Sequence, residues 1–205
     1  MMPRRLIQLM LGLTLYGASM ALMLRATLGL DPWDVFHQGL ASRVGLSFGM
    51  LVNVVGALVL LLWIPLRQKP GIGTIANVLT IGTSVDLTMM VVPEIHGLPL
   101  RVGVLLLSIV LNGIAGGLYI GAGLGPGPRD GLMTGLVRRT GWSIRLVRTG
   151  IELSVLAIGW LMGGTVGVGT VLYAFAIGPL VQVFLPLFLI APAAPATAET
   201  APVNP

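Results

Sequence analysis

Long hydrophobic runs without charged residues alternate with short polar segments along most of this chain. Residues 153–198 contain no charged side chain, and residues 70–93 contain only Asp86. A helix needs about 20 mainly apolar residues to cross a bilayer, so the longer run can hold two spans. The pattern predicts six transmembrane helices, at residues 6–28, 46–66, 74–92, 100–124, 149–162 and 169–190.

Two shorter segments, 29–45 and 125–148, each predict a helix of about 12 residues after a proline. After Pro32, the apolar residues fall three and four positions apart, which indicates one helical stripe. Such a helix is about 18 Å long and cannot cross a ~30 Å hydrocarbon core. Each short helix therefore lies at the interface or enters the membrane and returns. Residues 191–205 are rich in Ala and Pro, which predicts a disordered cytoplasmic tail.

The chain repeats itself at a spacing of 96 residues. Residues 28–87 match residues 124–183 at 17 of 60 positions without a gap. Each copy contains three predicted spans, and an odd number of spans reverses the orientation of the second copy. We therefore expect an all-α, polytopic membrane protein of two inverted-topology three-helix repeats, residues 1–98 and 99–190.

Glycine residues recur every four positions in the predicted fourth span. The 29 glycines of the chain include Gly113, Gly117 and Gly121, and the matching positions of the first span carry Gly17 and Ala21. Stripes of small residues let two membrane helices approach closely. This pattern predicts that the first and fourth spans cross through these small residues.

The distribution of charge predicts the orientation of the chain. Only 9% of residues are charged, mean hydropathy is +0.95, and the formal net charge is +5. All Lys and Arg residues except Arg25, Arg43 and Arg101 fall in segments on the same side as the N-terminus. This bias predicts a multi-pass protein of the bacterial inner membrane with both termini cytoplasmic, and it disfavours nucleic-acid binding. Three arginines of the inner connection are expected to bind lipid phosphates: Arg138, Arg139 and Arg145.

A carboxylate recurs at the start of both short helices. Asp34 and Asp130 each lie two residues after a proline, which is a common way to stabilise a helix start. The alternative is that they bind a cation or proton at opposite mouths of a solute path. His37 follows one turn later, and it is either a proton carrier or a surface group.

Further polar side chains lie inside predicted spans. Asp86 aligns with Gln182 in the repeat, and Asn77 lies on the same span as Asp86. A carboxylate in a span is costly unless it faces the bundle or water. These residues either line a central solute path or form a structural polar network. Arg148 and Glu152 are expected to form a local ion pair.

The sequence carries no signal for an enzyme. It has no cysteine, no His-Glu-x-x-His zinc motif and no Gly-x-Ser-x-Gly motif, so we expect no catalytic residues, no metal and no cofactor. Gly71-x-Gly-Thr74 and its copy at Gly167-x-Gly-Thr170 are explained by threonine capping the next helix. The expected partners are the lipid bilayer and either another membrane protein or a second copy of the chain.

The motif Gly-x-x-Pro-x-Asp-x-x-x-x-Gly-Leu occurs at residues 29–40 and again at 125–136. In this duplicated form it resembles the YczE/YyaS/YitT-type bacterial membrane proteins, with a similarity that covers about residues 6–187. The resemblance implies a helical membrane bundle and supplies no substrate. The repeat and the intramembrane polar residues favour a small transporter or permease-like protein for a small solute or ion. The alternative is an accessory or scaffold protein, or a substrate-capture subunit of a larger membrane complex.

Overall fold

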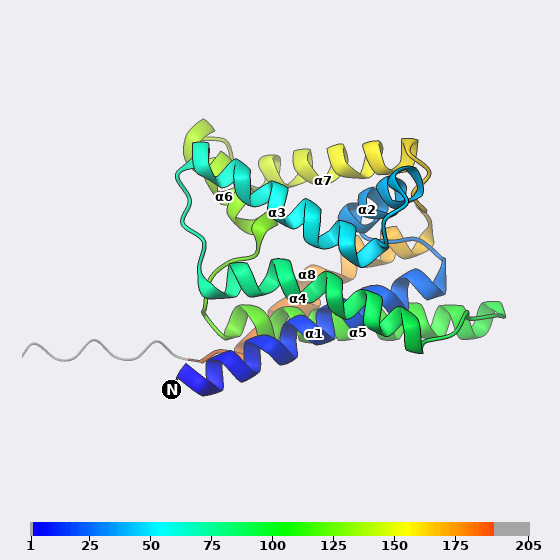
Figure 1. Ribbon diagram of the computed structural model, residues 1–205. Coiled ribbons are helices and arrows are strands. Elements are labelled where there is room, and N and C mark those ends of the chain that lie inside the picture. The colour runs from blue at the N-terminus through cyan, green and yellow to red at the C-terminus, as the bar shows by residue number, and fades with distance from the viewer. Residues whose placement is uncertain (1, 191–205) are drawn as a thin grey trace, which may run out of the picture.

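The computed structural model describes residues 2–190, which form eight α-helices and no β-strand (Figure 1). The helices are α1 Met2–Ala26, α2 Pro32–Val44, α3 Phe48–Leu66, α4 Ile72–Val91, α5 Leu98–Gly121, α6 Pro128–Thr140, α7 Ile144–Leu161 and α8 Val168–Phe188. The all-α fold and both short helices, α2 and α6, are confirmed. The tail at 191–205 lies outside the described residues.

Five of these helices are long and apolar enough to cross a membrane: α1, α3, α4, α5 and α8. The fifth predicted span, at residues 149–162, corresponds to α7, whose start was predicted wrongly at residue 149. It begins at Ile144, where the Ser143 side chain accepts a hydrogen bond from the first turn. Because this cap sets the start, Arg145, Arg148 and Glu152 lie within the helix.

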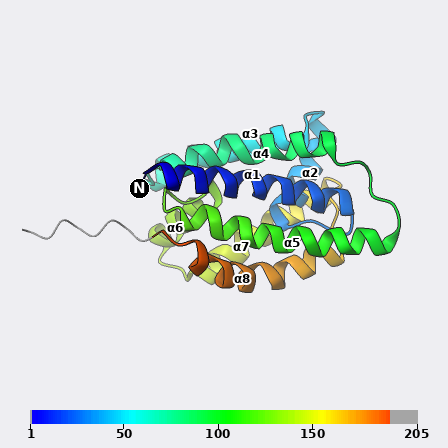
Figure 2. The same cartoon turned by 90° about the horizontal axis from the view of Figure 1, so that it is seen from below.

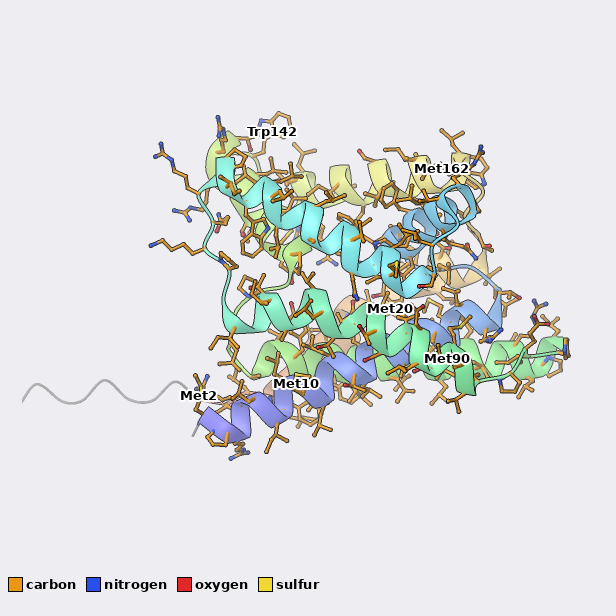
Figure 3. The ribbon with its side chains drawn as sticks, in the orientation of Figure 1. Met2, Met10, Met20, Met90, Trp142 and Met162 are labelled. Atoms are coloured by element: carbon orange, nitrogen blue, oxygen red, sulfur yellow. The ribbon has the colours of Figure 1, made fainter. Side chains whose placement is uncertain are left out.

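Large apolar side chains cover the outer surface of the helices (Figure 3). Met90 of α4 is 81% exposed, and Phe175 of α8 is 78% exposed. Soluble monomers rarely expose contiguous apolar patches larger than a few hundred Å². An apolar exterior on long apolar helices is what a lipid-facing surface requires, so this chain is a multi-pass membrane protein.

The helices form two layers (Figure 1). The first, which we call the four-helix layer, contains α4, α1, α5 and α8 side by side in that order (Figure 2). The second layer contains α2 packed on α7 and α3 packed on α6. The α3 helix also packs closely on α4, whereas α7 has no comparable contact with α8.

The repeat is preserved in the helix boundaries, because every helix of the first half starts 96 residues before one of the second half. The segment that leads into each short helix is also bound to the opposite half of the chain. We call residues 27–31 the first elbow and residues 122–127 the second elbow. Gly169 N donates to Leu28 O at 2.8 Å, and the equivalent Gly73 N donates to Leu124 O at 2.8 Å. Each elbow is therefore attached to the last helix of the opposite half.

The glycine stripe faces a different helix from the one predicted. An added Cβ at Gly113, Gly117 or Gly121 would meet α8, and one at Gly17 would meet α4. Ala21 belongs to the same apolar cluster as residues of α4. The first and fourth predicted spans, α1 and α5, do pack on each other, but the small residues of the predicted stripe face the last helix of their own half.

The Gly-x-Gly-Thr copies do not place threonine at the helix cap. Thr74 is the third residue of α4, where its Oγ1 accepts from Gly71 N at 3.0 Å and donates to Pro126 O at 2.7 Å. An added Cβ at Gly71 would collide with the second elbow, at the Leu124 carbonyl. The motif therefore docks the elbow of the other half onto the helix start.

Candidate functional site

The two short helices point their N-termini at each other in the centre of the molecule (Figure 1). Each elbow turns back from the end of a long helix, and this turn needs positive φ at two equivalent positions. Thr27 and Gly29 have φ of 52° and 117°, and Gly123 and Gly125 have φ of 65° and 125°. Glycine tolerates this region without strain. The elbows therefore deliver residues 31–34 and 127–130 to one central site.

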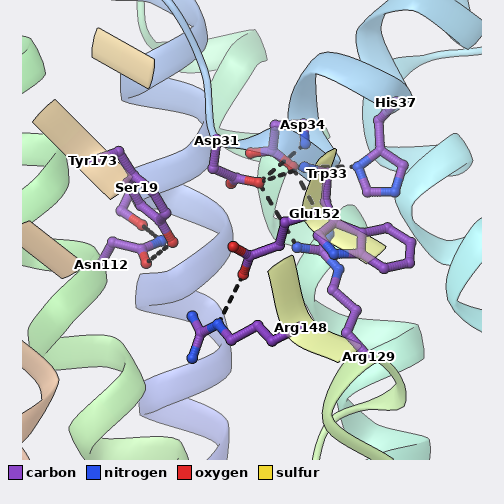
Figure 4. A network of polar contacts seen from close by, with 10 residues as sticks. All are labelled: Ser19, Asp31, Trp33, Asp34, His37, Asn112, Arg129, Arg148, Glu152 and Tyr173. Carbon is purple, nitrogen blue, oxygen red and sulfur yellow. Dashed lines mark hydrogen bonds and ion pairs between the residues drawn. The ribbon is translucent and has the colours of Figure 1, made fainter. Parts of the chain in front are cut away.

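Asp31 and Asp34 share one arginine from the other half (Figure 4). Arg129 Nη1 lies 3.9 Å from Asp31 Oδ1, and Arg129 Nη2 lies 3.9 Å from Asp34 Oδ1. Asp31 also caps α2, because its Oδ1 accepts from Trp33 N at 2.9 Å and Asp34 N at 3.1 Å. The guanidinium stacks on the Trp33 ring at 4.8 Å, a cation–π contact.

Both carboxyl groups are almost completely buried, at 4% exposure for Asp31 and 0% for Asp34. Burial, followed by the adjacent Asp34 carboxylate, raises the pKa of Asp31 to about 7, and the effect of Arg129 is smaller. Burial raises the pKa of Asp34 to about 6 against the opposing effect of Arg129. One guanidinium is therefore insufficient to keep both carboxyl groups ionised near neutral pH.

His37 extends the polar cluster along α2. Its Nδ1 lies 3.2 Å from Asp34 Oδ1, and its ring is buried against Trp33, Phe36 and Phe48. Burial, followed by the positive charge of Arg129, lowers the pKa of His37 well below its usual value of 6.5. The imidazole is therefore neutral, and the contact with Asp34 is a hydrogen bond.

A cavity of about 370 Å³, the central cavity, opens beside this cluster. Asp31 of the first elbow and Arg129 and Asp130 of α6 line it. Most of its remaining wall comes from α1, α5, α7 and α8 and includes Tyr16, Asn112, Gly116, Tyr119, Arg148, Ile151, Glu152, Tyr173, Ile177, Gly178 and Gln182. Charged, amide and phenolic groups from both halves therefore converge on one space.

Hydrogen bonds hold the polar wall of the central cavity in place. Tyr119 Oη donates to Asp130 Oδ2 at 2.8 Å and accepts from Gly127 N at 2.8 Å. On the opposite wall, Tyr173 Oη donates to Asn112 Oδ1 at 3.0 Å, and Asn112 Nδ2 donates to Ser19 Oγ at 2.9 Å (Figure 4). These hydrogen bonds fix the orientation of the polar groups that line the cavity.

The predicted Arg148–Glu152 ion pair also forms part of the cavity wall. Arg148 Nε lies 2.9 Å from Glu152 Oε1, which confirms the pairing. Both residues line the central cavity, a position that the sequence alone did not indicate. Arg129, in contrast, keeps 31% of its side chain accessible although it lies deep in the bundle, because its accessible part faces the cavity.

A second space of about 100 Å³, the small cavity, lies on the other side of the elbows. Several of its lining residues are the repeat equivalents of residues around the central cavity. Tyr16, Val55, Gly56, Asn77 and Ile81 line the small cavity. Their equivalents 96 residues later, Asn112, Ile151, Glu152, Tyr173 and Ile177, line the central cavity. The two cavities also share Tyr16, Trp33, Tyr119, Arg129 and Asp130 as a common wall.

The structure places the predicted path residues in different environments. Asp34 of α2 lies 3.9 Å from Arg129 and lines neither cavity, whereas Asp130 of α6 lines both cavities. Gln182 lines the central cavity, while Asn77 and His37 line the small cavity.

Asp86 lines neither of these cavities. Its carboxylate accepts hydrogen bonds from the Ser47 side chain and from Gly49 N, the latter at 2.9 Å, and so joins α4 to the first turn of α3. The expectation that Asp86 lines the central path was wrong, because this helix start has unpaired N–H groups that a carboxylate can satisfy.

Among the predicted lipid-phosphate ligands, Arg139 makes a contact within the protein, since its Nη1 donates to Pro65 O at 3.0 Å. Lipid binding by Arg138 and Arg145 stays a prediction. The sequence reasoning missed Asp31, Arg129, Tyr16 and Tyr119. Asp31 directly before Pro32 is a helix-cap signal, but its repeat equivalent is Gly127, so a search for matching residues passed over it.

Comparisons with known proteins show the family to which the chain belongs. A model of a family of unknown function (DUF6198) matches residues 3–186. An uncharacterized protein of Haemophilus influenzae is 38% identical over 177 residues, which cover 86% of this chain and 81% of the relative. The uncharacterized membrane protein YczE of Bacillus subtilis is 37% identical over 172 residues, 83% of this chain and 80% of the relative.

The uncharacterized protein YyaS of Bacillus subtilis is 26% identical over 184 residues, 86% of this chain and 90% of the relative. No solved structure matches the chain. The resemblance to YczE and YyaS that the duplicated proline–aspartate motif indicated is confirmed. The chain belongs to the DUF6198 family and is an integral membrane protein.

Proposed function

We propose that the chain is a transporter for a small solute, built from two inverted three-span repeats in the bacterial inner membrane. In this proposal α7 also crosses the membrane and brings the number of spans to six. The short helices α2 and α6 are re-entrant, and both termini are cytoplasmic. The equal spacing of the helix starts and the reciprocal elbow contacts support the duplication. Trp33 and Arg129 are repeat equivalents in direct contact, which happens only close to a twofold axis.

The observation that carries the proposal is the pair of equivalent cavities with unequal volumes. In inverted-repeat transporters the solute site lies at the repeat interface near the bilayer midplane, often at the ends of broken helices. Here the central cavity and the small cavity meet at such helix ends, and their volumes are about 370 Å³ and 100 Å³. Enlarging one while the other shrinks would move a solute from one side of the elbows to the other.

The helix packing explains why the volumes differ. An added Cβ at Gly82 of α4 would collide with the Gly49 carbonyl of α3, so these two helices are in close contact. At the equivalent position on α8, an added Cβ on Gly178 would meet no atom within 4 Å. The α3–α4 side is therefore closed, while the α7–α8 side is open beside the central cavity.

Cysteine accessibility tests the proposal. Gly178→Cys places the only thiol of the chain in the wall of the central cavity without a steric clash. Phe175→Cys is the matched control, because it lies three residues earlier on α8 and its side chain is 78% exposed on the apolar exterior. A water-soluble, membrane-impermeant thiol reagent should modify Gly178→Cys much faster than Phe175→Cys. Equal rates, or no modification of Gly178→Cys from either side of the membrane, would refute a water-accessible path.

The accessory or scaffold alternative depends on free glycine faces for a partner. The glycine face of α5 is already covered, because Gly117 lies against the backbone of Phe184 and Leu185 in α8. No comparable surface remains on this stripe for another protein. The cavity geometry therefore favours transport over a scaffold role.

A further inference from the structure

We propose that the Asp31–Asp34 pair is a proton site that couples transport, loaded from the central cavity through Asp31 and unloaded towards the small cavity through His37. The coupling rests on the proposed transport function. The proton site itself stands on the geometry of the two carboxyl groups.

One buried oxygen of the Asp31–Asp34 pair lacks a hydrogen-bond donor. Asp31 Oδ1 accepts from two backbone amides, and Asp34 Oδ1 is paired with His37. Asp34 Oδ2 is buried and has no hydrogen-bond partner among the described residues. A buried acceptor without a partner is costly. A proton on the neighbouring Asp31 carboxyl group would supply the missing donor.

The charges around the pair also leave room for one proton. Among residues 2–190, Arg129 of α6 is the one cation that contacts both carboxylates, at 3.9 Å from each. Arg148 of α7 is not available, because Glu152 neutralises it at 2.9 Å. Two carboxylates facing one guanidinium carry one excess negative charge in a buried site, which a proton neutralises.

The other groups that face the pair do not change this balance. Tyr16 of α1 and Tyr173 of α8 are neutral phenols that interact electrostatically with Asp31 and Asp34. Asp130 of α6 accepts a hydrogen bond from the Tyr119 phenol of α5 at 2.8 Å. The α3 helix presents the apolar Phe48 to His37. Burial raises the pKa of both members of the pair, which agrees with the geometry.

The pair lies between the two cavities. Asp31 lines the central cavity, His37 lines the small cavity, and Asp34 contacts the imidazole and lies beside Asp31 (Figure 4). A chain of ionisable groups thus connects two spaces that are related by the repeat. This is the arrangement that a proton needs in order to be taken up on one side and released on the other.

The transfer balances for a single proton. Hydronium in the central cavity protonates the Asp31 carboxylate and leaves water, and the proton then passes to Asp34. The relay starts from the neutral His37 tautomer that carries its hydrogen on Nε2, so that Nδ1 is an acceptor facing Asp34 Oδ1. The O–H bond of Asp34 breaks as a bond forms to His37 Nδ1. The Nε2–H bond of His37 breaks in turn, and that proton leaves to water in the small cavity. The imidazole ends neutral as its other tautomer, which agrees with a ring that burial keeps uncharged.

Infrared titration of the purified protein in lipid vesicles tests the site. The carboxylic C=O stretching band should fall in intensity as the pH rises from about 5 to about 9, because a buried acid with a raised pKa loses its proton in this range. Asp31→Asn and Asp34→Asn, which keep the side-chain shape, should each remove this change. Asp86→Asn, a carboxylate outside both cavities, should retain it. The proton site would be refuted if the intensity of the wild-type band does not change with pH. It would also be refuted if the change persists in both Asp→Asn variants.

A pH jump on one side of the vesicle membrane at a time tests the route. In the wild type the band should respond from either side. His37→Phe keeps an aromatic ring against Phe48 and should abolish the response from one side only. Full response from both sides in His37→Phe would overturn the relay.

The two proposals fail separately. If the band titrates but Gly178→Cys is not modified, the proton site stands without transport coupling. If Gly178→Cys is modified and no band titrates, the path stands without this proton site.

Discussion

The contrast between Gly82 and Gly178 gives a direct test of the closed and open sides of the molecule. These residues are repeat equivalents on α4 and α8, so the same substitution can be compared in two related places. An added Cβ at Gly82 would overlap the Gly49 carbonyl and the Asn53 side chain of α3. An added Cβ at Gly178 would meet no atom within 4 Å.

The two alanine substitutions should therefore change the free energy of unfolding in opposite directions. Replacing glycine by alanine within a helix gains about 1 kcal/mol from helix propensity alone. Gly178→Ala should retain most of this gain. At Gly82 the new methyl group collides with a backbone carbonyl that cannot move without shifting a helix, and overpacking of this kind costs about 1–3 kcal/mol or more. The free energies of unfolding should differ by about 2 kcal/mol or more, with Gly82→Ala the less stable.

Thermal unfolding in detergent micelles, followed by circular dichroism, measures this difference. Gly82→Ala should lower the midpoint, and Gly178→Ala should leave it unchanged or raise it. Similar shifts in both variants would mean that α7 packs on α8 as tightly as α3 packs on α4. The unequal cavities would then not describe the protein in solution.

Three further substitutions or conditions test other contacts. Gly117→Leu forces a side chain against the α8 backbone and should destabilise the fold by about 1–3 kcal/mol, read from its unfolding midpoint. Tyr119→Phe leaves the buried Gly127 N–H without its acceptor and should cost about 1–3 kcal/mol in the same assay. The pKa of Asp31 is raised from 3.8 to about 7, so its contribution to stability is present at acidic pH and lost as the pH rises to about 7. The unfolding midpoint should fall over this range, and Asp31→Asn should flatten the fall; an unchanged slope in the variant contradicts the assignment.

The sequence could predict the helices and the duplication because local signals determine both. Pro32 and Pro128 start the short helices, and Ser47 and Ser143 cap the next ones at the same spacing. These signals act within a few residues, so they are visible without knowing what packs against them. The start of α7 was predicted at residue 149, although the Ser143 cap sets it at Ile144.

The candidate site could be predicted only in part because its partners come from different halves. Asp31 and Arg129 meet between the two halves of the sequence, yet their repeat equivalents are Gly127 and Trp33. A comparison of the two copies favours residues that are retained in both, such as Asp34 and Asp130. It passes over residues that complement each other between the two halves, and these make the ion pairs and the cation–π contact.

The packing also predicts which parts of the molecule move. The two sequence halves are not separate bodies, because each elbow is hydrogen-bonded to the last helix of the opposite half. The groups of helices expected to move as rigid bodies are the four-helix layer and the pairs α2–α7 and α3–α6. Each pair contains one helix from each half. Exchange between the cavities then moves α7 relative to α8 while α5 stays fixed to α8.

Spin labels at glycines with free space distinguish this motion from rocking of the sequence halves. Added side chains at Gly103 of α5, Gly150 of α7 and Gly178 of α8 meet no atom within 4 Å. In the cysteine-free chain, labels at residues 150 and 178 should give a distance distribution that shifts between acidic and alkaline pH, since the proton site lies between the cavities. Labels at residues 103 and 178 should give one unchanged distance. Halves that rock as rigid bodies would leave both distances constant, because α5, α7 and α8 all belong to the second half. That result would refute the layer-based motion.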